Sequence, residues 1–208
     1  MLVIGITGGV ASGKSTVCKM LSDMDVVVAD VDKVAHGEYK KGTACHAQII
    51  ECFGDVVVTA DGEIDRRKLG GIVFSDKSKM TQLTDIVWPA VRQALIQYLA
   101  TAEESSVREG RPTPFIAMEA AIMIEAGWQD LVSVLWVIEV DRVQAKDKLM
   151  ARDKLSEEEA FKRIDSQISN EERRKHATYV IKNDISKEEL QLETRRLYDL
   201  TIASATNV

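Results

Sequence analysis

The residues best suited to chemistry lie near the start of the chain, in a glycine-rich segment that ends in lysine and serine. A Walker A pattern, G-x-x-x-x-G-K-[ST], is present as Gly8-Gly9-Val10-Ala11-Ser12-Gly13-Lys14-Ser15-Thr16. Gly8 and Gly13 permit backbone conformations that let successive amide groups turn inward around a β-phosphate. Lys14 can reach the β- and γ-phosphates, and the hydroxyl of Ser15 can bind Mg²⁺. The segment therefore predicts binding of a nucleoside triphosphate.

Carboxylates follow two apolar runs that are predicted strands. Asp30 and Asp32 come after Val26 to Ala29, and Glu119 comes after Phe115 to Met118. Ligands of open α/β sheets bind beyond the carboxyl ends of the strands, so either aspartate could accept a proton from a phosphoryl acceptor, with Asp32 favoured. Glu119 could hold a water on Mg²⁺. All three have a structural alternative, because acidic residues are also favoured where a helix begins.

Basic residues supply further candidates for contacts with phosphate. Arg152 lies in a polar region and could stabilise transition-state charge as an arginine finger does, although a lone arginine on a helix is usually solvated. Two triplets, Arg66-Arg67-Lys68 and Arg173-Arg174-Lys175, are typical of a solvated face. Either triplet could instead contact phosphate. The sequence leaves both alternatives open.

The composition excludes several classes of function. A chain of 208 residues with a net charge of −6 can bury one sizeable core, but it offers no broad basic field for nucleic acid. Cysteines 18, 45 and 52 lack ligand-like spacing, which predicts neither a disulfide framework nor a zinc site and favours the reducing cytoplasm. No apolar run has the length of a membrane span, so we expect no membrane partner. The sequence does not determine the oligomeric state.

The alternation of β-rich and helical stretches predicts an α/β fold with a parallel sheet and helices on both faces. We expect strands at Val3 to Thr7, Val26 to Ala29, Phe115 to Met118, Leu135 to Val140 and Tyr179 to Ile181. These belong to one domain whose core is about residues 1–30, 114–141 and 177–208.

The interval of residues 31–113 predicts a helical insertion. We expect its helices near residues 31–41, 44–53, 66–74 and 80–103, with a turn at Asp61-Gly62 and a surface loop over 104–114. His46 and His176 are expected at the surface.

A second polar region, residues 142–176, predicts a helical lid. Arg142 to Arg152 forms one helix, and Ser156 with Glu159 forms a capping box that opens another. A further box, Ser186 with Glu189, starts a last helix. Its core-facing residues are expected to be Leu190, Thr194, Leu197 and Thr201.

From Ile4 to about Asn183 the chain resembles the dephospho-coenzyme A kinases. The motifs that carry the resemblance are, in order, Gly5-Ile6-Thr7-Gly8-Gly9 with Ser15-Thr16, Asp30-Val31-Asp32-Lys33-Val34-Ala35-His36, Phe53-Gly54, Asp61-Gly62-Glu63-Ile64-Asp65-Arg66, Leu69, Ile72-Val73-Phe74, Glu119-Ala120-Ala121-Ile122-Met123, Arg152-Asp153, Ser156, Arg163-Ile164, Gln167, Arg173 and Val180-Ile181-Lys182-Asn183.

The resemblance implies a P-loop NTPase-type sheet with a helical acceptor-binding insertion and a helical lid. It implies transfer of the γ-phosphoryl group of ATP to the ribose 3′-hydroxyl of dephospho-CoA, with Mg²⁺ as cofactor. The catalytic residues that it implies are Asp32 as base, Lys14 and Arg152. The substrate-binding residues are Asp32, Arg66 and Glu119, the nucleotide is held by Gly8 to Thr16, and the metal is held by Ser15.

Four positions depart from the pattern of this family. Trp88 stands before Pro89 where a histidine is common, and Lys148 stands where an arginine is frequent. Thr178 replaces a common aspartate, and Ala11 replaces a loop glycine. A kinase for another small acceptor, such as a nucleoside or nucleotide, is the main alternative function. An inactive nucleotide-binding module is another alternative, and a switch GTPase is disfavoured because Asp-x-x-Gly and Asn-Lys-x-Asp are absent from the sequence.

Overall fold

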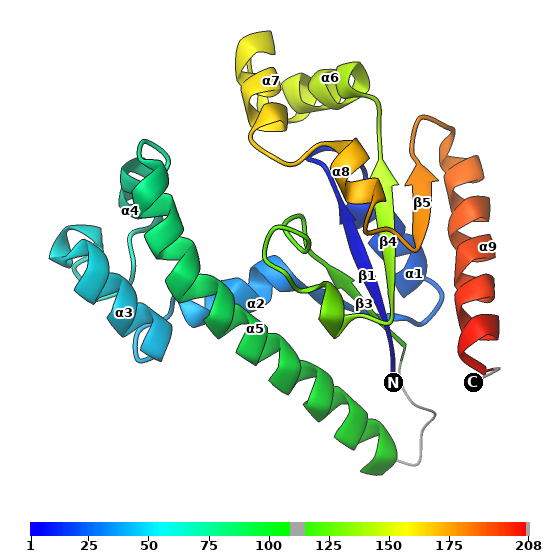
Figure 1. Cartoon of the computed structure of the whole chain (residues 1–208), viewed down its shortest axis with the longest axis horizontal. Coiled ribbons are helices and arrows are strands. Elements are labelled where there is room, and N and C mark those ends of the chain that lie inside the picture. The colour runs from blue at the N-terminus through cyan, green and yellow to red at the C-terminus, as the bar shows by residue number, and fades with distance from the viewer. Residues whose placement is uncertain (109–114, 207–208) are drawn as a thin grey trace. The chain divides into compact units, whose positions relative to one another are not determined.

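The computed structural model describes residues 1–108 and 115–206 and divides into two compact units (Figure 1). The first unit comprises Met1–Asp30 and Glu103–Val208, and the second comprises Val31–Ala102. No described helix combines the length and the apolar character that crossing a membrane would require.

The first unit is built on a five-stranded parallel sheet with the strand order β2-β3-β1-β4-β5. The strands are β1 (Leu2–Gly8), β2 (Val27–Asp30), β3 (Phe115–Glu119), β4 (Val134–Glu139) and β5 (Tyr179–Lys182). β1 and β4 are almost continuously buried, because central strands of a parallel sheet are covered on both faces and need apolar side chains at every position. The predicted α/β class and its five strands are confirmed.

Helices α1 (Lys14–Ser22) and α9 (Lys187–Thr206) pack against each other and complete the core of this unit. The core joins apolar residues of the sheet, such as Ile4 and Trp136, to Leu21 of α1 and Leu197 of α9. The predicted face of α9 is confirmed, since each of its members is at most 2% exposed: Leu190, Thr194, Leu197 and Thr201.

Both predicted capping boxes are present. The backbone N–H of Ser186 donates to Glu189 Oε2 at 2.8 Å, and the N–H of Glu189 donates to Ser186 Oγ at 3.2 Å. The same reciprocal pair joins Ser156 and Glu159 at the start of α7 (Glu157–Asp165). These bonds satisfy amide groups that the first helical turn leaves without backbone partners.

The polar region after β4 forms three helices, α6 (Arg142–Asp153), α7 (Glu157–Asp165) and α8 (Asn170–Arg174). Helices α6 and α7 pack together. The guanidinium of Arg142 lies 4.1 Å from the centroid of the Phe161 ring and donates to both carboxylate oxygens of Asp165, at 3.0 and 2.8 Å. Arg142 therefore ties the beginning of α6 to α7.

The second unit contains α2 (Val31–Glu38), α3 (Ala44–Phe53), the 3₁₀ turn η1 (Asp55–Val57), α4 (Arg66–Val73) and most of α5 (Lys77–Arg108). Thr43 and Asp65 cap α3 and α4 through their side chains. An antiparallel bridge between Val58 and Ile64 closes the predicted turn at Asp61-Gly62. The helical character predicted for this interval is confirmed.

Two expectations for this part of the chain are wrong. His46 is 8% exposed rather than at the surface, because its ring nitrogen Nε2 makes a 2.9 Å hydrogen bond with the carbonyl oxygen of Gly62. Residues 104–108 continue α5 instead of forming a loop, since the glutamate and arginine in this stretch favour helix. Residues 109–114 of the expected loop lie outside the described residues.

We expect Leu197→Ala to lower the free energy of unfolding by about 2–5 kcal/mol, because truncating a buried leucine loses apolar burial and leaves a cavity. Leu200→Ala is the matched control, since Leu200 lies on the same helix but is 41% exposed, and it should cost less than about 1 kcal/mol. Urea denaturation followed by circular dichroism measures both values. Similar losses in the two variants would contradict the assignment of the core face of α9.

Candidate functional site

The Walker A segment forms a tight loop between β1 and α1. Gly8 and Gly13 adopt φ angles of 153° and 97°, which non-glycine residues rarely tolerate. A Cβ atom on Gly8 would collide with the carbonyl oxygen of Ile138 in β4, and one on Gly13 would collide with Nδ2 of Asn183. Both glycines are therefore required by backbone conformation and by close approach.

Asn183 anchors the loop to the carboxyl end of the sheet. Its Nδ2 donates to the carbonyl oxygen of Ser12 at 2.8 Å, and its backbone N–H donates to the carbonyl oxygen of Glu139 at 2.7 Å. The residue that follows β5 thus holds the loop against the end of β4.

Lys14 bends back over the loop. Its Nζ donates to the carbonyl oxygens of Gly8 and Gly9, each at 3.0 Å. The N-terminus of α1 adds positive partial charge at the same place, because its first amide groups have no helical partners. Ser15 follows in the first turn of α1 with an exposed side chain. The arrangement can bind a polyphosphate.

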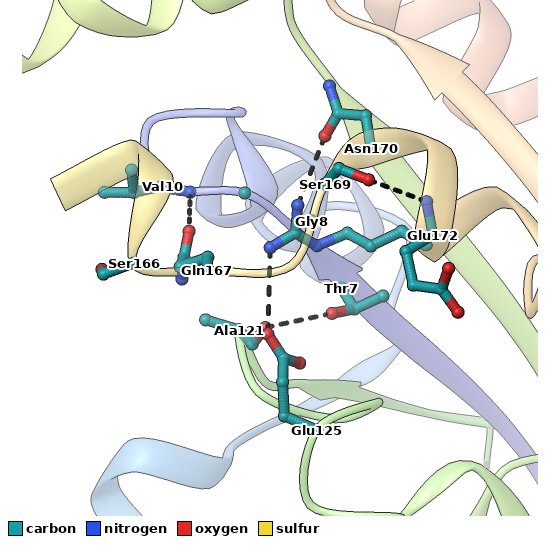
Figure 2. Close-up of polar contacts among 12 residues, drawn as sticks. Thr7, Gly8, Val10, Ala121, Glu125, Ser166, Gln167, Ser169, Asn170 and Glu172 are labelled. Atoms are coloured by element: carbon teal, nitrogen blue, oxygen red, sulfur yellow. Dashed lines mark hydrogen bonds and ion pairs between the residues drawn. The ribbon is translucent and has the colours of Figure 1, made fainter. Parts of the chain in front are cut away.

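The segment that joins α7 to α8 lies against the loop, as Figure 2 shows. The backbone N–H of Val10 donates to Oε1 of Gln167 at 2.7 Å. Gly9, Val10 and Ser12 line a pocket of about 480 Å³ together with residues of this segment, among them Gln167 and Arg173. Gln167 stands in the sequence only as one of the motifs that carry the family resemblance, and its partner Val10 is seen only in the folded chain.

Carboxylates and a lysine gather around the side chain of Cys18 in α1. Asp30 and Glu119 are partners in the register of β2 and β3, so they end two neighbouring strands side by side. Burial and the hydrogen-bonded carboxylate of Glu119 raise the pKa of the Cys18 thiol, while the charge of Lys14 acts in the opposite direction. The structure therefore brings Lys14, Asp30 and Glu119 together beside the loop.

Two predicted site residues belong to the helical unit. Asp32 is an exposed residue in the first turn of α2, and that helix begins directly after Asp30 ends β2. Arg66 begins α4, where its guanidinium lies 5.7 Å from the centroid of the Tyr39 ring. The continuous chain carries Asp32 to within two residues of the carboxyl edge of the sheet.

Arg152 lies near the end of α6, with its guanidinium engaged by a neighbouring carboxylate. Nε and Nη2 of Arg152 donate to the two oxygens of Asp153 at 2.6 and 2.8 Å, and Arg163 donates to the same carboxylate at 2.8 Å. Asp153 has a lowered pKa because these hydrogen bonds and positive charges favour its ionised form. Asp153 thereby joins the end of α6 to α7.

The three basic residues of the second triplet have different surroundings. Arg173 is 2% exposed and lies against the loop, whereas Arg174 pairs with Glu139 at 2.8 Å. Lys175 pairs with Glu172 at 2.6 Å on the surface. Only the folded chain separates the buried arginine from its solvated neighbours.

Residues 2–189 match the family model described as dephospho-CoA kinase. The chain belongs to the dephospho-CoA kinase family. It is 39% identical over 198 residues to the dephospho-CoA kinase of Geobacter sulfurreducens, covering 95% of this chain and 98% of that protein.

Solved structures agree with this family assignment. The dephospho-CoA kinase from Campylobacter jejuni superposes with a TM-score of 0.69 at 27% identity, covering 99% of this chain and 98% of that chain. A protein from Thermus thermophilus gives a TM-score of 0.77 at 30% identity, covering 95% and 96% of the two chains.

Thr178 shows how one departure from the family pattern is accommodated. Its hydroxyl accepts a 3.0 Å hydrogen bond from the backbone N–H of Leu135, and its own N–H donates to the carbonyl oxygen of Leu135 at 2.8 Å. A hydroxyl oxygen can take this bond as a carboxylate would. Of the other departures, Lys148 is exposed on α6 and Trp88 is partly buried on α5.

Ala11 adopts a left-handed conformation, with φ of 58°, which is a conformation that favours glycine. Such a conformation costs a residue with a Cβ roughly 1–2 kcal/mol, and glycine's greater freedom in the unfolded chain offsets part of that amount. We expect Ala11→Gly to raise the free energy of unfolding by about 0.5–1 kcal/mol.

Ala100→Gly, at an exposed position within α5, is the control for this substitution. It should lower stability by about 1 kcal/mol, because glycine is a poor helix former. Thermal and urea denaturation report both changes, and a loss of stability in both variants would refute strain at Ala11.

Proposed function

We propose that this chain transfers the γ-phosphoryl group of ATP to the ribose 3′-hydroxyl of dephospho-CoA, the last step of coenzyme A synthesis. The observation that carries the proposal is the match of residues 2–189 to the dephospho-CoA kinase family. The preserved geometry of the loop and its lysine supports it. The free cysteines Cys18, Cys45 and Cys52 support a cytoplasmic location, where thiols are kept reduced.

The nucleotide is held by the loop from Gly8 to Thr16. Its inward amide groups surround the β-phosphate, and Lys14 leaves the carbonyl oxygens of Gly8 and Gly9 to pair with the β- and γ-phosphates. The N-terminal end of α1 adds positive partial charge that attracts the phosphates. These groups stabilise charge that moves toward the β-phosphate as the bond to the γ-phosphorus breaks.

The residues beside the loop fit Mg²⁺. Within the described residues no group of three or more histidine, cysteine, aspartate or glutamate side chains forms a metal cage of its own. Mg²⁺ instead favours few protein oxygens, with waters and phosphates completing its shell. Ser15 would hold the ion directly, while Asp30 and Glu119 would hold its waters, and the ion would neutralise charge on the β- and γ-phosphates.

Asp32 acts as the base in this mechanism. Its carboxylate accepts the proton of the 3′-hydroxyl while the oxygen bonds to the γ-phosphorus and ADP leaves with the electrons of the broken bond. Arg66, in the helical unit, contacts the acceptor. Arg152, in the helical region after β4, leaves Asp153 to stabilise the transferring phosphoryl group, as arginine fingers do.

An assay of ADP release with Mg-ATP tests the function. Dephospho-CoA is compared with buffer, adenosine and nucleoside monophosphates, and the mass of each product is determined. We expect product to form only with dephospho-CoA, and its mass to be one phosphate heavier. In the NMR spectrum of this product the new phosphorus should couple to the hydrogen on the ribose 3′ carbon. Transfer to a nucleoside or nucleotide, with none to dephospho-CoA, would refute the acceptor assignment.

Asp32→Asn should lower kcat by about a hundredfold or more while changing the KM for ATP by less than about threefold, because asparagine keeps the shape but cannot take a proton. Steady-state kinetics separate the two parameters. Asp85→Asn, at an exposed position on α5, is the control and should behave as the wild type. Lys14→Ala should differ from both of these variants, because it should lower kcat and also weaken the binding of ATP. Near-normal turnover of Asp32→Asn would remove Asp32 from the role of base.

A further inference from the structure

The most unusual charged group beside the loop is the guanidinium of Arg173. The residue is 2% exposed, and its Nη1 donates to Oδ1 of Asn170 at 3.3 Å. Among the residues that the structure describes, its Nε and Nη2 have no hydrogen-bond partner. Burying such donors without partners is unfavourable, since they lose their bonds to water. A fold that keeps them therefore points to a ligand that they bind.

The position of Arg173 identifies the part of the loop that it faces. Its Nη1 lies 3.4 Å from the place that a Cβ atom on Gly9 would occupy, which is van der Waals distance, so the guanidinium packs directly against Gly9. Lys14 Nζ contacts the carbonyl oxygen of the same glycine at 3.0 Å. Two cations thus meet at Gly9, and the lysine of this motif is the one that reaches the β- and γ-phosphates.

A second polar atom points to the same ligand. Arg173 and Ser12 line one pocket with Gly9, and the Oγ of Ser12 is buried without a hydrogen-bond partner among the described residues. A phosphate oxygen accepts hydrogen bonds from both a hydroxyl and a guanidinium. The pocket therefore contains a hydroxyl and a guanidinium that can donate hydrogen bonds to a polyphosphate.

The competing explanation is a structural ion pair with Glu125, which Figure 2 shows beneath the loop. The distance from Arg173 Nη2 to Glu125 Oε1 is 4.0 Å, well beyond the roughly 2.8 Å of a charge-assisted hydrogen bond. The other buried carboxylate nearby, Glu139, already accepts two hydrogen bonds from Arg174, at 3.0 and 2.8 Å. Neither glutamate therefore accepts a hydrogen bond from Nε or Nη2 of Arg173.

We propose that Arg173 binds the β- and γ-phosphates of ATP, with Asn170 and Glu125 positioning its guanidinium over Gly9. The inference rests on the proposed function for the identity of the nucleotide. It assigns to one member of the basic triplet a role that its neighbours lack, because Arg174 and Lys175 are directed to Glu139 and Glu172. The planar fork of arginine suits the oxygens of two adjacent phosphates.

Calorimetric titration of Arg173→Met with β,γ-methylene-ATP and with ADP, each with Mg²⁺, tests this contact. We expect the Kd for the analogue to rise roughly tenfold or more and the Kd for ADP to rise by a smaller factor, because ADP keeps the β-phosphate contact but lacks the γ-phosphate. Arg173→Lys should lie between the two proteins, since lysine keeps the charge without the fork. Lys175→Gln is the surface control and should bind both nucleotides as the wild type does.

The double variant Arg173→Met with Glu125→Gln separates a phosphate contact from a structural ion pair. It removes both buried charges, so it also keeps the test valid if Arg173→Met alone fails to fold. We expect the double variant to fold and still to bind the analogue roughly tenfold more weakly than the wild type. Wild-type affinity in the double variant would overturn the proposal.

These titrations contain no dephospho-CoA, so their outcome does not depend on the acceptor. A wild type that binds the analogue but phosphorylates a different acceptor would refute the proposed function alone. A wild type that phosphorylates dephospho-CoA, with unchanged analogue affinity in Arg173→Met, would refute the role of Arg173 alone.

Discussion

The loop between β1 and α1 must turn its amide groups inward while its backbone touches the neighbouring strands. Gly8 meets the carbonyl oxygen of Ile138, and Gly13 meets the side chain of Asn183, so no Cβ fits at either position. The first contact arises because β1 and β4 are neighbours in the sheet, and the second because the asparagine that follows β5 reaches the carbonyl oxygen of Ser12. The conformation of the loop thus depends on strands that are distant in the sequence.

Charge around the loop is balanced rather than uniformly positive. Lys14 and Arg173 bring cations to Gly9, while Asp30, Glu119 and Glu125 bring carboxylates close to them. Partly desolvated charges interact more strongly than exposed ones, so each cation is held in place and still has donors to offer an anion.

The departures from the family pattern carry modest structural consequences. Thr178 accepts the hydrogen bond from Leu135 through its hydroxyl, and Ala11 accepts a left-handed backbone at a cost of roughly 1–2 kcal/mol. Strain of this size is retained where the surrounding contacts determine the backbone, as they do in a phosphate-binding loop. Neither change alters Lys14 or the glycines that form the cradle.

The sequence by itself determined the features that depend on neighbours along the chain. The loop motif, the five strands, both capping boxes and the buried face of α9 follow from local residue types and their periodicity. Long-range contacts decided the rest. The burial of His46 requires the carbonyl oxygen of Gly62, and the contact of Gln167 with Val10 joins residues separated by 157 positions.

The basic triplet shows this division most clearly. Arg173, Arg174 and Lys175 are chemically alike in the sequence, yet one is buried over Gly9 and two are paired with glutamates. Consecutive residues of a helix point in directions about 100° apart, so the packing of α8 against the sheet decides which of them faces the loop. Local pattern determined which residues could bind phosphate, and tertiary packing decided which one lies beside the loop.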